Sequence, residues 1–171
     1  AFLRQRAALP GTTSQIISDV NRQLSRDVAA TGSFMTMLYM TIDKPGKRLH
    51  WVWAGHDPAI FYDPQADTIA ELKGPGIALG VDEDFQFAEN LREDIRDGQI
   101  LLLGTDGIWE ARNPNGDMFG KDAVFSIIKE NAHLGAAAIL DQLIEQLTAF
   151  QEGGNVEDDI TLIVVKVTAA F

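Results

Sequence analysis

Two acidic segments of the sequence could bind a divalent metal ion. The apolar run 100–103 leads through a Gly-Thr pair into Asp106 and Gly107, so a carboxylate stands at the end of a predicted buried strand. A second acidic group, 157–159, directly precedes the apolar run near the C-terminus. Hard oxygen ligands of this kind suit Mg²⁺ or Mn²⁺. Each segment alone is also compatible with an ordinary turn or a solvated strand end, and only the fold can bring the two together.

One histidine also lies where it could take part in chemistry. His56 follows a predicted strand, within a Gly-His-Asp-Pro segment, and could serve as a general acid or a metal ligand. We expect it instead to hold the turn by hydrogen bonding to the loop backbone. His50 and His133 have no companion residues at metal-ligand spacing. The sequence contains no G-x-S-x-G, P-loop, G-x-G-x-x-G or H-E-x-x-H motif.

The composition limits the classes of protein to which the chain can belong. It has 171 residues, 46% of them hydrophobic, and 14 basic against 25 acidic residues give a net charge of −11. That charge argues against binding to nucleic acid or to an anionic membrane, since both need clusters of Lys and Arg. The absence of cysteine excludes disulfides, thiolate zinc sites and a cysteine nucleophile. With no apolar run near the ~20 residues of a membrane span and no signal peptide, we expect a cytoplasmic protein.

The two acidic segments need a scaffold, and the hydrophobic periodicity predicts a mixed one. Apolar residues at helical spacing, with Thr12 and Gln15 as a capping box, predict a helix over 13–29. An apolar run at 34–42, which suits a central buried strand, and an alternating run at 49–54 predict an antiparallel hairpin. The other predicted elements are a helical run at 1–9, strands at 59–63, 68–72, 85–92, 99–104 and 160–167, and two helices around 124–128 and 140–150. The loops between strands are too short for helical crossovers, so we expect largely antiparallel sheets in an α+β domain.

Five short segments, each a weak signal by itself, form an ordered set that spans nearly the whole chain. They are AGHDPA (54–59), LGV (79–81), LGTDGIWEA (103–111), NPNGDMFG (113–120) and DDITL (158–162). In this order and at these intervals they resemble the SpoIIE-type branch of the metal-dependent protein serine/threonine phosphatases.

The resemblance implies a fold and a metal site. The fold is an α-β-β-α sandwich of two mainly antiparallel sheets flanked by helices, in agreement with the element order above. Two divalent ions, Mn²⁺ or Mg²⁺, would be held by aspartates at one end of the sandwich, with Asp106 and Asp158 at matching ligand positions. The motif residues that would support the ligands or shape the loops are Gly107, Glu110, Asp159 and His56.

The resemblance also implies how such a domain works. A metal-activated water attacks the phosphorus of phosphoserine or phosphothreonine in line, so no side chain acts as the nucleophile. The family's first metal motif, Gly-Asp-x-x-Asp, and a Gly-His-Gly segment normally precede the helix with which this chain opens, and neither occurs here. We therefore expect a single domain over residues 1–171 that lacks its N-terminal segment, binds Mn²⁺ weakly and turns over slowly or not at all.

The resemblance implies partners as well. Such domains follow sensory domains and act on phosphorylated anti-anti-sigma proteins of the STAS type, in bacterial signal transduction and sigma-factor regulation. The sequence does not identify the substrate protein, the sensory input or the oligomeric state, a homodimer included. Two alternatives stay open: a non-catalytic partner-binding module of the same fold, and a haloacid-dehalogenase-like phosphatase. The second needs an Asp-x-Asp motif, and Gly104 stands where its first Asp should be.

Overall fold

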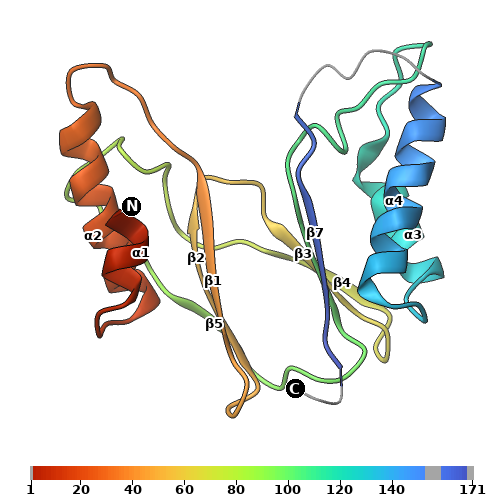
Figure 1. Ribbon diagram of the computed structural model, residues 1–171, viewed down its shortest axis with the longest axis horizontal. Helices are drawn as coiled ribbons and strands as arrows, with labels where there is room; N and C mark the ends of the chain where they lie inside the picture. Colours follow the sequence, from red (N-terminus) through yellow and green to blue (C-terminus); the bar gives the residue numbers. More distant parts are fainter. Residues whose placement is uncertain (1, 153–158, 169–171) are drawn as a thin grey trace. The chain divides into compact units, whose positions relative to one another are not determined.

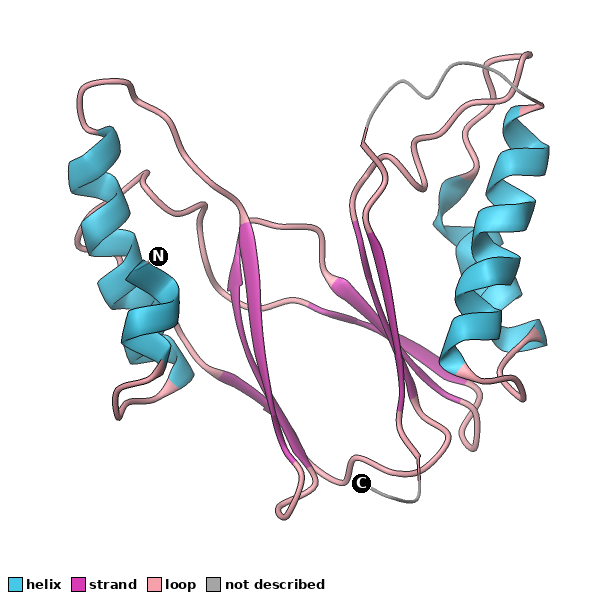
Figure 2. Cartoon of the chain, in the orientation of Figure 1, coloured by secondary structure: helices cyan, strands magenta, loops and turns pink. Residues whose placement is uncertain are grey.

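The computed structural model describes residues 2–152 and 159–168, and the chain divides into two compact units (Figure 1). Unit 1 consists of Ala1–Pro58 and Lys73–Ile95, and unit 2 of Ala59–Leu72 and Arg96–Phe171. Each unit contains one antiparallel sheet with helices packed against it, as the colouring of Figure 2 shows. Within the described residues, no helix is long and apolar enough to cross a membrane.

Unit 1 combines two helices with a three-stranded sheet. Its elements are α1 (Phe2–Ala7), α2 (Thr13–Val28), β1 (Met37–Asp43), β2 (Arg48–Ala54) and β5 (Asn90–Arg92). The strand order is β1-β2-β5, and both pairings are antiparallel. Ile16, Ile17 and Val20 recur at helical spacing on α2, and together with buried β2 residues they form the core of this unit.

The beginning of α2 is held by its own cap and by a carboxylate. Thr12 and Gln15 form the predicted capping box. Glu89 accepts hydrogen bonds from the backbone N–H (2.9 Å) and the hydroxyl of Thr13, and its other oxygen lies 3.0 Å from Nδ1 of His50 in β2. Burial by itself raises the pKa of Glu89, but the hydrogen bonds from Thr13 and His50 outweigh it and hold the pKa below its ordinary value of 4.5. Glu89 therefore ties the first turn of α2 to the sheet.

The middle of α2 is tied to the segment that leads into β5. Asn21 is fully buried; its Nδ2 donates to the carbonyl of Asp82 (2.7 Å), and its Oδ1 accepts the N–H of Gly80 (2.9 Å). Three residues earlier on the helix, Ser18 Oγ accepts the N–H of Phe87 (3.2 Å). These bonds join three backbone groups of the segment to side chains of the helix.

Unit 2 packs two helices against a four-stranded sheet. Its elements are β3 (Ala59–Asp63), β4 (Thr68–Leu72), β6 (Ile100–Gly104), α3 (Gly120–Glu130), α4 (Ala136–Gln151) and β7 (Leu162–Lys166). The strand order is β4-β3-β6-β7, and every pairing is antiparallel. Alternate residues of β3 and β6 face the helices and form the core with them. The buried members are Ile60, Tyr62, Ile100, Leu102, Val124, Ile127, Ile128, Ile139, Leu143 and Leu147.

The predicted α+β class, with two antiparallel sheets and flanking helices, is confirmed, and two strand predictions need correction. The run 34–42 was expected to form a central buried strand, but β1 lies at the edge of the described three-stranded sheet and its residues are half-buried or exposed. An apolar pattern predicts a strand but does not give the number of its hydrogen-bonded neighbours. The strand expected at 85–92 is reduced to Asn90–Arg92, and the backbone N–H of Phe87 donates to Ser18 of α2 instead of to a strand.

Replacing Asn21 by Ala should lower the free energy of unfolding by about 2 kcal/mol, because a fully buried side chain loses its hydrogen bonds to the N–H of Gly80 and the carbonyl of Asp82 and each hydrogen bond contributes roughly 0.5–1.5 kcal/mol. Urea denaturation measures the change. Gln23→Ala on the same helix is the matched control, because its side chain bonds only to Asp27 at the surface. We expect a change within about 0.5 kcal/mol for that variant. Equal losses for the two variants would contradict the anchoring role of Asn21.

The contribution of Glu89 to stability should depend on pH. Because the pKa of the folded state is depressed, the carboxylate stabilises the fold above about pH 4.5, and this contribution is lost as the pH falls through the lower folded pKa. The difference in unfolding free energy between the parent protein and Glu89→Gln should therefore be constant between about pH 5 and about pH 7. It should shrink as the pH falls below about 4.5. Denaturation at a series of pH values checks this, and a difference independent of pH would contradict it.

Candidate metal centre at the end of β6

Asp106 lies at the surface of unit 2, in a tight turn directly after β6. A side chain at Gly104 would place its Cβ 2.5 Å from Cδ1 of Ile108, so glycine lets the strand end pack against the turn. Ile108 and Trp109, which follow Gly107, are buried in the core of the unit and hold the turn in place. The N–H of Gly107 donates to Oδ1 of Asp106 (3.1 Å) and orients the carboxylate. An exposed carboxylate is thus presented on a rigid base.

Thr105 joins this turn to the segment that opens β7. Its hydroxyl donates to the carbonyl of Asp159 (2.9 Å) and accepts the N–H of Thr161 (3.0 Å). Its own N–H donates to the carbonyl of Thr161 (3.1 Å). These three bonds continue the β6–β7 ladder beyond its last pair, Gly104 and Leu162. The fold therefore brings Asp159, distant in sequence, to the strand end that carries the turn of Asp106.

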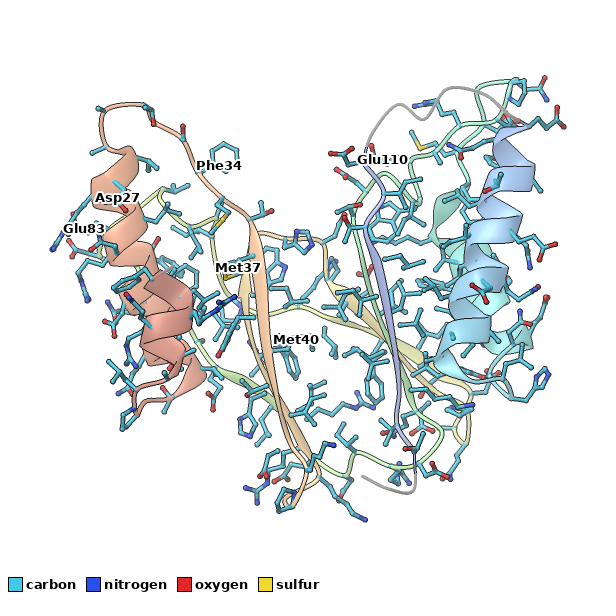
Figure 3. All side chains as sticks on the ribbon, viewed as in Figure 1. Asp27, Phe34, Met37, Met40, Glu83 and Glu110 are labelled. Carbon is cyan, nitrogen blue, oxygen red and sulfur yellow. The ribbon has the colours of Figure 1, made fainter. Side chains whose placement is uncertain are left out.

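The structure places four of the predicted site residues in this region. Asp106, Gly107 and Glu110 share the turn, and the N–H of Glu110 donates to the carbonyl of Asp106 (2.9 Å). Glu110, which Figure 3 labels, is exposed, and so is Asp106. Asp159 is exposed and lies on the segment that Thr105 binds. Asp158, the second predicted ligand, lies outside the described residues.

His56 belongs to unit 1 and lies in the turn that follows β2. Its carbonyl accepts the indole N–H of Trp53 (2.5 Å), and its Nδ1 lies 3.3 Å from the hydroxyl of Thr36. Gly55 before it has a positive φ of 76°, and an added Cβ would lie 3.1 Å from the backbone nitrogen of Ala78. Glycine at position 55 thus allows the turn after β2 to lie close to the backbone of Ala78.

The donors at the end of β6 fit a divalent ion in their chemistry. They are exposed carboxylates, the ligands that Mg²⁺ and Mn²⁺ prefer. Across residues 2–152 and 159–168, no group of three or more His, Asp or Glu side chains gathers at metal-binding distance. Asp106 can therefore supply one ligand and Asp159 can support the site, and a full coordination shell needs further donors.

Thr105 is the site residue that sequence reasoning missed. In the Gly-Thr-Asp-Gly segment, the sequence predicted a role only for the carboxylate and the glycines. A threonine directly after a buried strand can bond to neighbouring backbone through its hydroxyl, and that signal was present. Its partners, Asp159 and Thr161, could not be identified without the strand pairing.

Comparisons with known proteins agree with the motif pattern. The family model described as Stage II sporulation protein E (SpoIIE) matches residues 1–168. The phosphoserine phosphatase RsbU of Bacillus subtilis (strain 168) is 27% identical over 153 residues, which are 90% of this chain and 44% of that protein. The chain thus spans less than half the length of this relative.

Two solved structures share the fold. The SiaA-PP2C domain of Pseudomonas aeruginosa is 18% identical, with a TM-score of 0.82 over 97% of this chain and 66% of that chain. The phosphatase domain of SpoIIE from Bacillus subtilis, presoaked with Mn, is also 18% identical, with a TM-score of 0.61 over 98% of this chain and 72% of that chain. The predicted family and fold are confirmed by these matches.

Replacing Thr105 by Val should loosen the connection between β6 and the segment before β7, because valine has nearly the same shape without the hydroxyl. The amide of Thr161 should exchange with solvent several-fold faster, and the free energy of unfolding should fall by about 1 kcal/mol. Hydrogen exchange followed by NMR measures the first effect. Thr105→Ser, which keeps the hydroxyl, is the control. Unchanged exchange at Thr161 in the valine variant would contradict the proposed connection.

Proposed function

The chain belongs to the SpoIIE family, and from that premise we propose that it removes phosphate from phosphoserine or phosphothreonine of a signalling protein, using water activated by Mn²⁺ or Mg²⁺. The observation that carries the proposal is the set of Thr105 hydrogen bonds, which bring the turn of Asp106 and the acidic segment before β7 to one strand end. The printed name of RsbU, a phosphoserine phosphatase, supports the choice of reaction.

Asp106 and Asp158 would hold the ions, with Asp159 supporting them from the same segment. Divalent ions bound by carboxylates supply a hydroxide nucleophile at neutral pH and neutralise the charge of the phosphate oxygens. The reaction needs no nucleophilic side chain, in keeping with a chain that has no cysteine. The solved SpoIIE phosphatase domain was presoaked with Mn, which supports the choice of metal.

The chain's own residues would act by positioning. The N–H of Gly107 orients the Asp106 carboxylate, and the buried Ile108 and Trp109 prevent the turn from shifting. The three hydrogen bonds of Thr105 fix the spacing between the two acidic segments. Sites that bind ions for catalysis depend on such supporting residues nearly as much as on the ligands themselves.

The substrate would be a phosphorylated protein of the anti-anti-sigma STAS type, in sigma-factor regulation, and a sensory domain would precede the domain in the full-length protein. This part of the proposal rests on the motif resemblance.

Phosphate release from a synthetic phosphoserine peptide should require Mn²⁺ or Mg²⁺ and stop when EDTA is added. Asp106→Asn and Asp158→Asn should each lower kcat/KM by about 100-fold or more, because even residues behind metal ligands are worth about 10–100-fold. Asp141→Asn, an exposed acidic residue on α4, is the matched control and should leave the rate unchanged.

The assay compares the 171-residue chain with a version that carries any native sequence preceding Ala1, since the resemblance implies metal ligands there. Release in the absence of metal, or an equal loss for Asp141→Asn, would contradict the proposed site. If neither version releases phosphate although both are folded, the result would favour the non-catalytic partner-binding module.

A further inference from the structure

A small pocket lies between α1 and α2, which pack beside each other in unit 1 (Figure 1). Its volume is about 200 Å³. Phe2 and Arg6 line it from α1, where they stand four positions apart and so lie on one face of that helix. The lining residues from α2 also follow helical spacing and are Asp19, Arg22, Gln23 and Arg26. One face of each helix therefore contributes to a single concave surface.

This pocket is a basic region of an acidic chain. Residues 1–28 contain four basic and two acidic residues, whereas the whole chain has 14 basic and 25 acidic residues. Arg22 and Arg26 stand four positions apart on α2, a spacing at which like charges repel each other. Arg6 adds a third guanidinium from α1. An anion bound in the pocket would relieve this repulsion.

Two carboxylates of the chain already bind these arginines. Asp19 accepts hydrogen bonds from Nε of Arg6 (2.6 Å) and from Nη1 of Arg22 (3.0 Å). These bonds hold the pKa of Asp19 below its ordinary value of 3.8, so its carboxylate is ionised at neutral pH. Glu83 accepts a hydrogen bond from Nε of Arg26 (2.8 Å). Three cations and two anions leave one positive charge unbalanced.

Two of the arginines keep most of their hydrogen-bonding capacity. A guanidinium has five N–H donors. Within the described part of the chain, Arg22 and Arg26 each use one of these donors. Their side chains are 39% and 61% exposed, so the remaining donors are accessible to a partner. Asp27, the next acidic residue of α2, is bound by Gln23 (2.9 Å) and does not line the pocket.

We propose that this pocket docks an Asp or Glu side chain of a partner protein segment. The planar fork of arginine matches the two oxygens of a carboxylate, and one carboxylate neutralises the one unbalanced charge. A phosphate group would bring nearly two negative charges and would be repelled by Asp19.

The size of the pocket also favours a single side chain. Pockets that enclose free small molecules measure about 300–1,000 Å³, more than the volume of this one. Phe2 is 40% exposed and offers an apolar contact to the residue next to the carboxylate. The proposal does not depend on the phosphatase activity.

Three peptides in a Gly-Ser background test the proposal. The first carries a Glu-Leu pair, the second Gln-Leu and the third phosphoserine-Leu. Titration of the ¹⁵N-labelled protein, followed by NMR, gives the dissociation constants and locates the site. The first peptide should bind at least about tenfold more tightly than the second, because hydrogen bonds between charged groups are stronger than those to a neutral amide. The third should bind no more tightly than the first. Amide shifts should change at residues 2–6 and 19–26, and binding should weaken as salt is raised.

Arg22→Gln and Arg26→Gln should each weaken binding of the Glu-Leu peptide by about tenfold, because each removes a charged donor. Arg4→Gln is the matched control: it removes the same charge from α1, but Arg4 does not line the pocket, and binding should be unchanged. Circular dichroism checks that each variant is folded.

Four results would overturn the proposal. The first is equal binding of the Glu-Leu and Gln-Leu peptides, and the second is an equal loss for Arg4→Gln and the two α2 variants. The third is tighter binding of the phosphoserine peptide that Arg22→Gln abolishes, which would identify a phosphate site instead. The fourth is self-association of the protein that Arg22→Gln abolishes, since the occupant would then be a second copy of the chain.

Discussion

The hydroxyl of Thr105 is the connection on which the candidate metal centre depends. The last pair of the β6–β7 ladder is Gly104 and Leu162, and beyond it the backbone pairing continues with the hydrogen bond from the N–H of Thr105 to the carbonyl of Thr161. Thr105 continues the pairing with its side chain, by donating to one carbonyl and accepting from one N–H of the opposite segment. Each bond contributes only about 1 kcal/mol net, yet together they fix where two acidic segments meet.

The charge at this strand end sets a condition on the proposed function. Carboxylates repel one another and also repel a phosphate group that carries nearly two negative charges at neutral pH. A phosphatase with an acidic site therefore needs cations there before a phosphoprotein can approach, and the chain's overall charge of −11 adds to that need. Membership of the SpoIIE family also decides against the haloacid-dehalogenase alternative, whose Asp-x-Asp motif the chain lacks.

Local signals in the sequence predicted local structure well. The capping box of Thr12 and Gln15 depends on residues three positions apart, and the hairpin of β1 and β2 on a short turn, so both could be predicted. The shortening of β5 could not, because the backbone N–H of Phe87 bonds to Ser18 of α2, about 70 residues earlier. The position of β1 at a sheet edge was equally hidden, since an apolar run does not give the number of neighbouring strands, and β1 is only half-buried or exposed. The carboxylate of Asp106 was recognised from its place after a buried strand, whereas the role of Thr105 depends on pairing across more than 50 residues.

The buried amide of Asn21 has a consequence for how unit 1 opens. One side chain holds both Gly80 and Asp82, so the middle of α2 is bound directly to the segment that leads into β5. Movement of α2 away from the sheet would have to release both hydrogen bonds in one event. Hydrogen exchange at the amide of Gly80 is therefore coupled to the position of the helix.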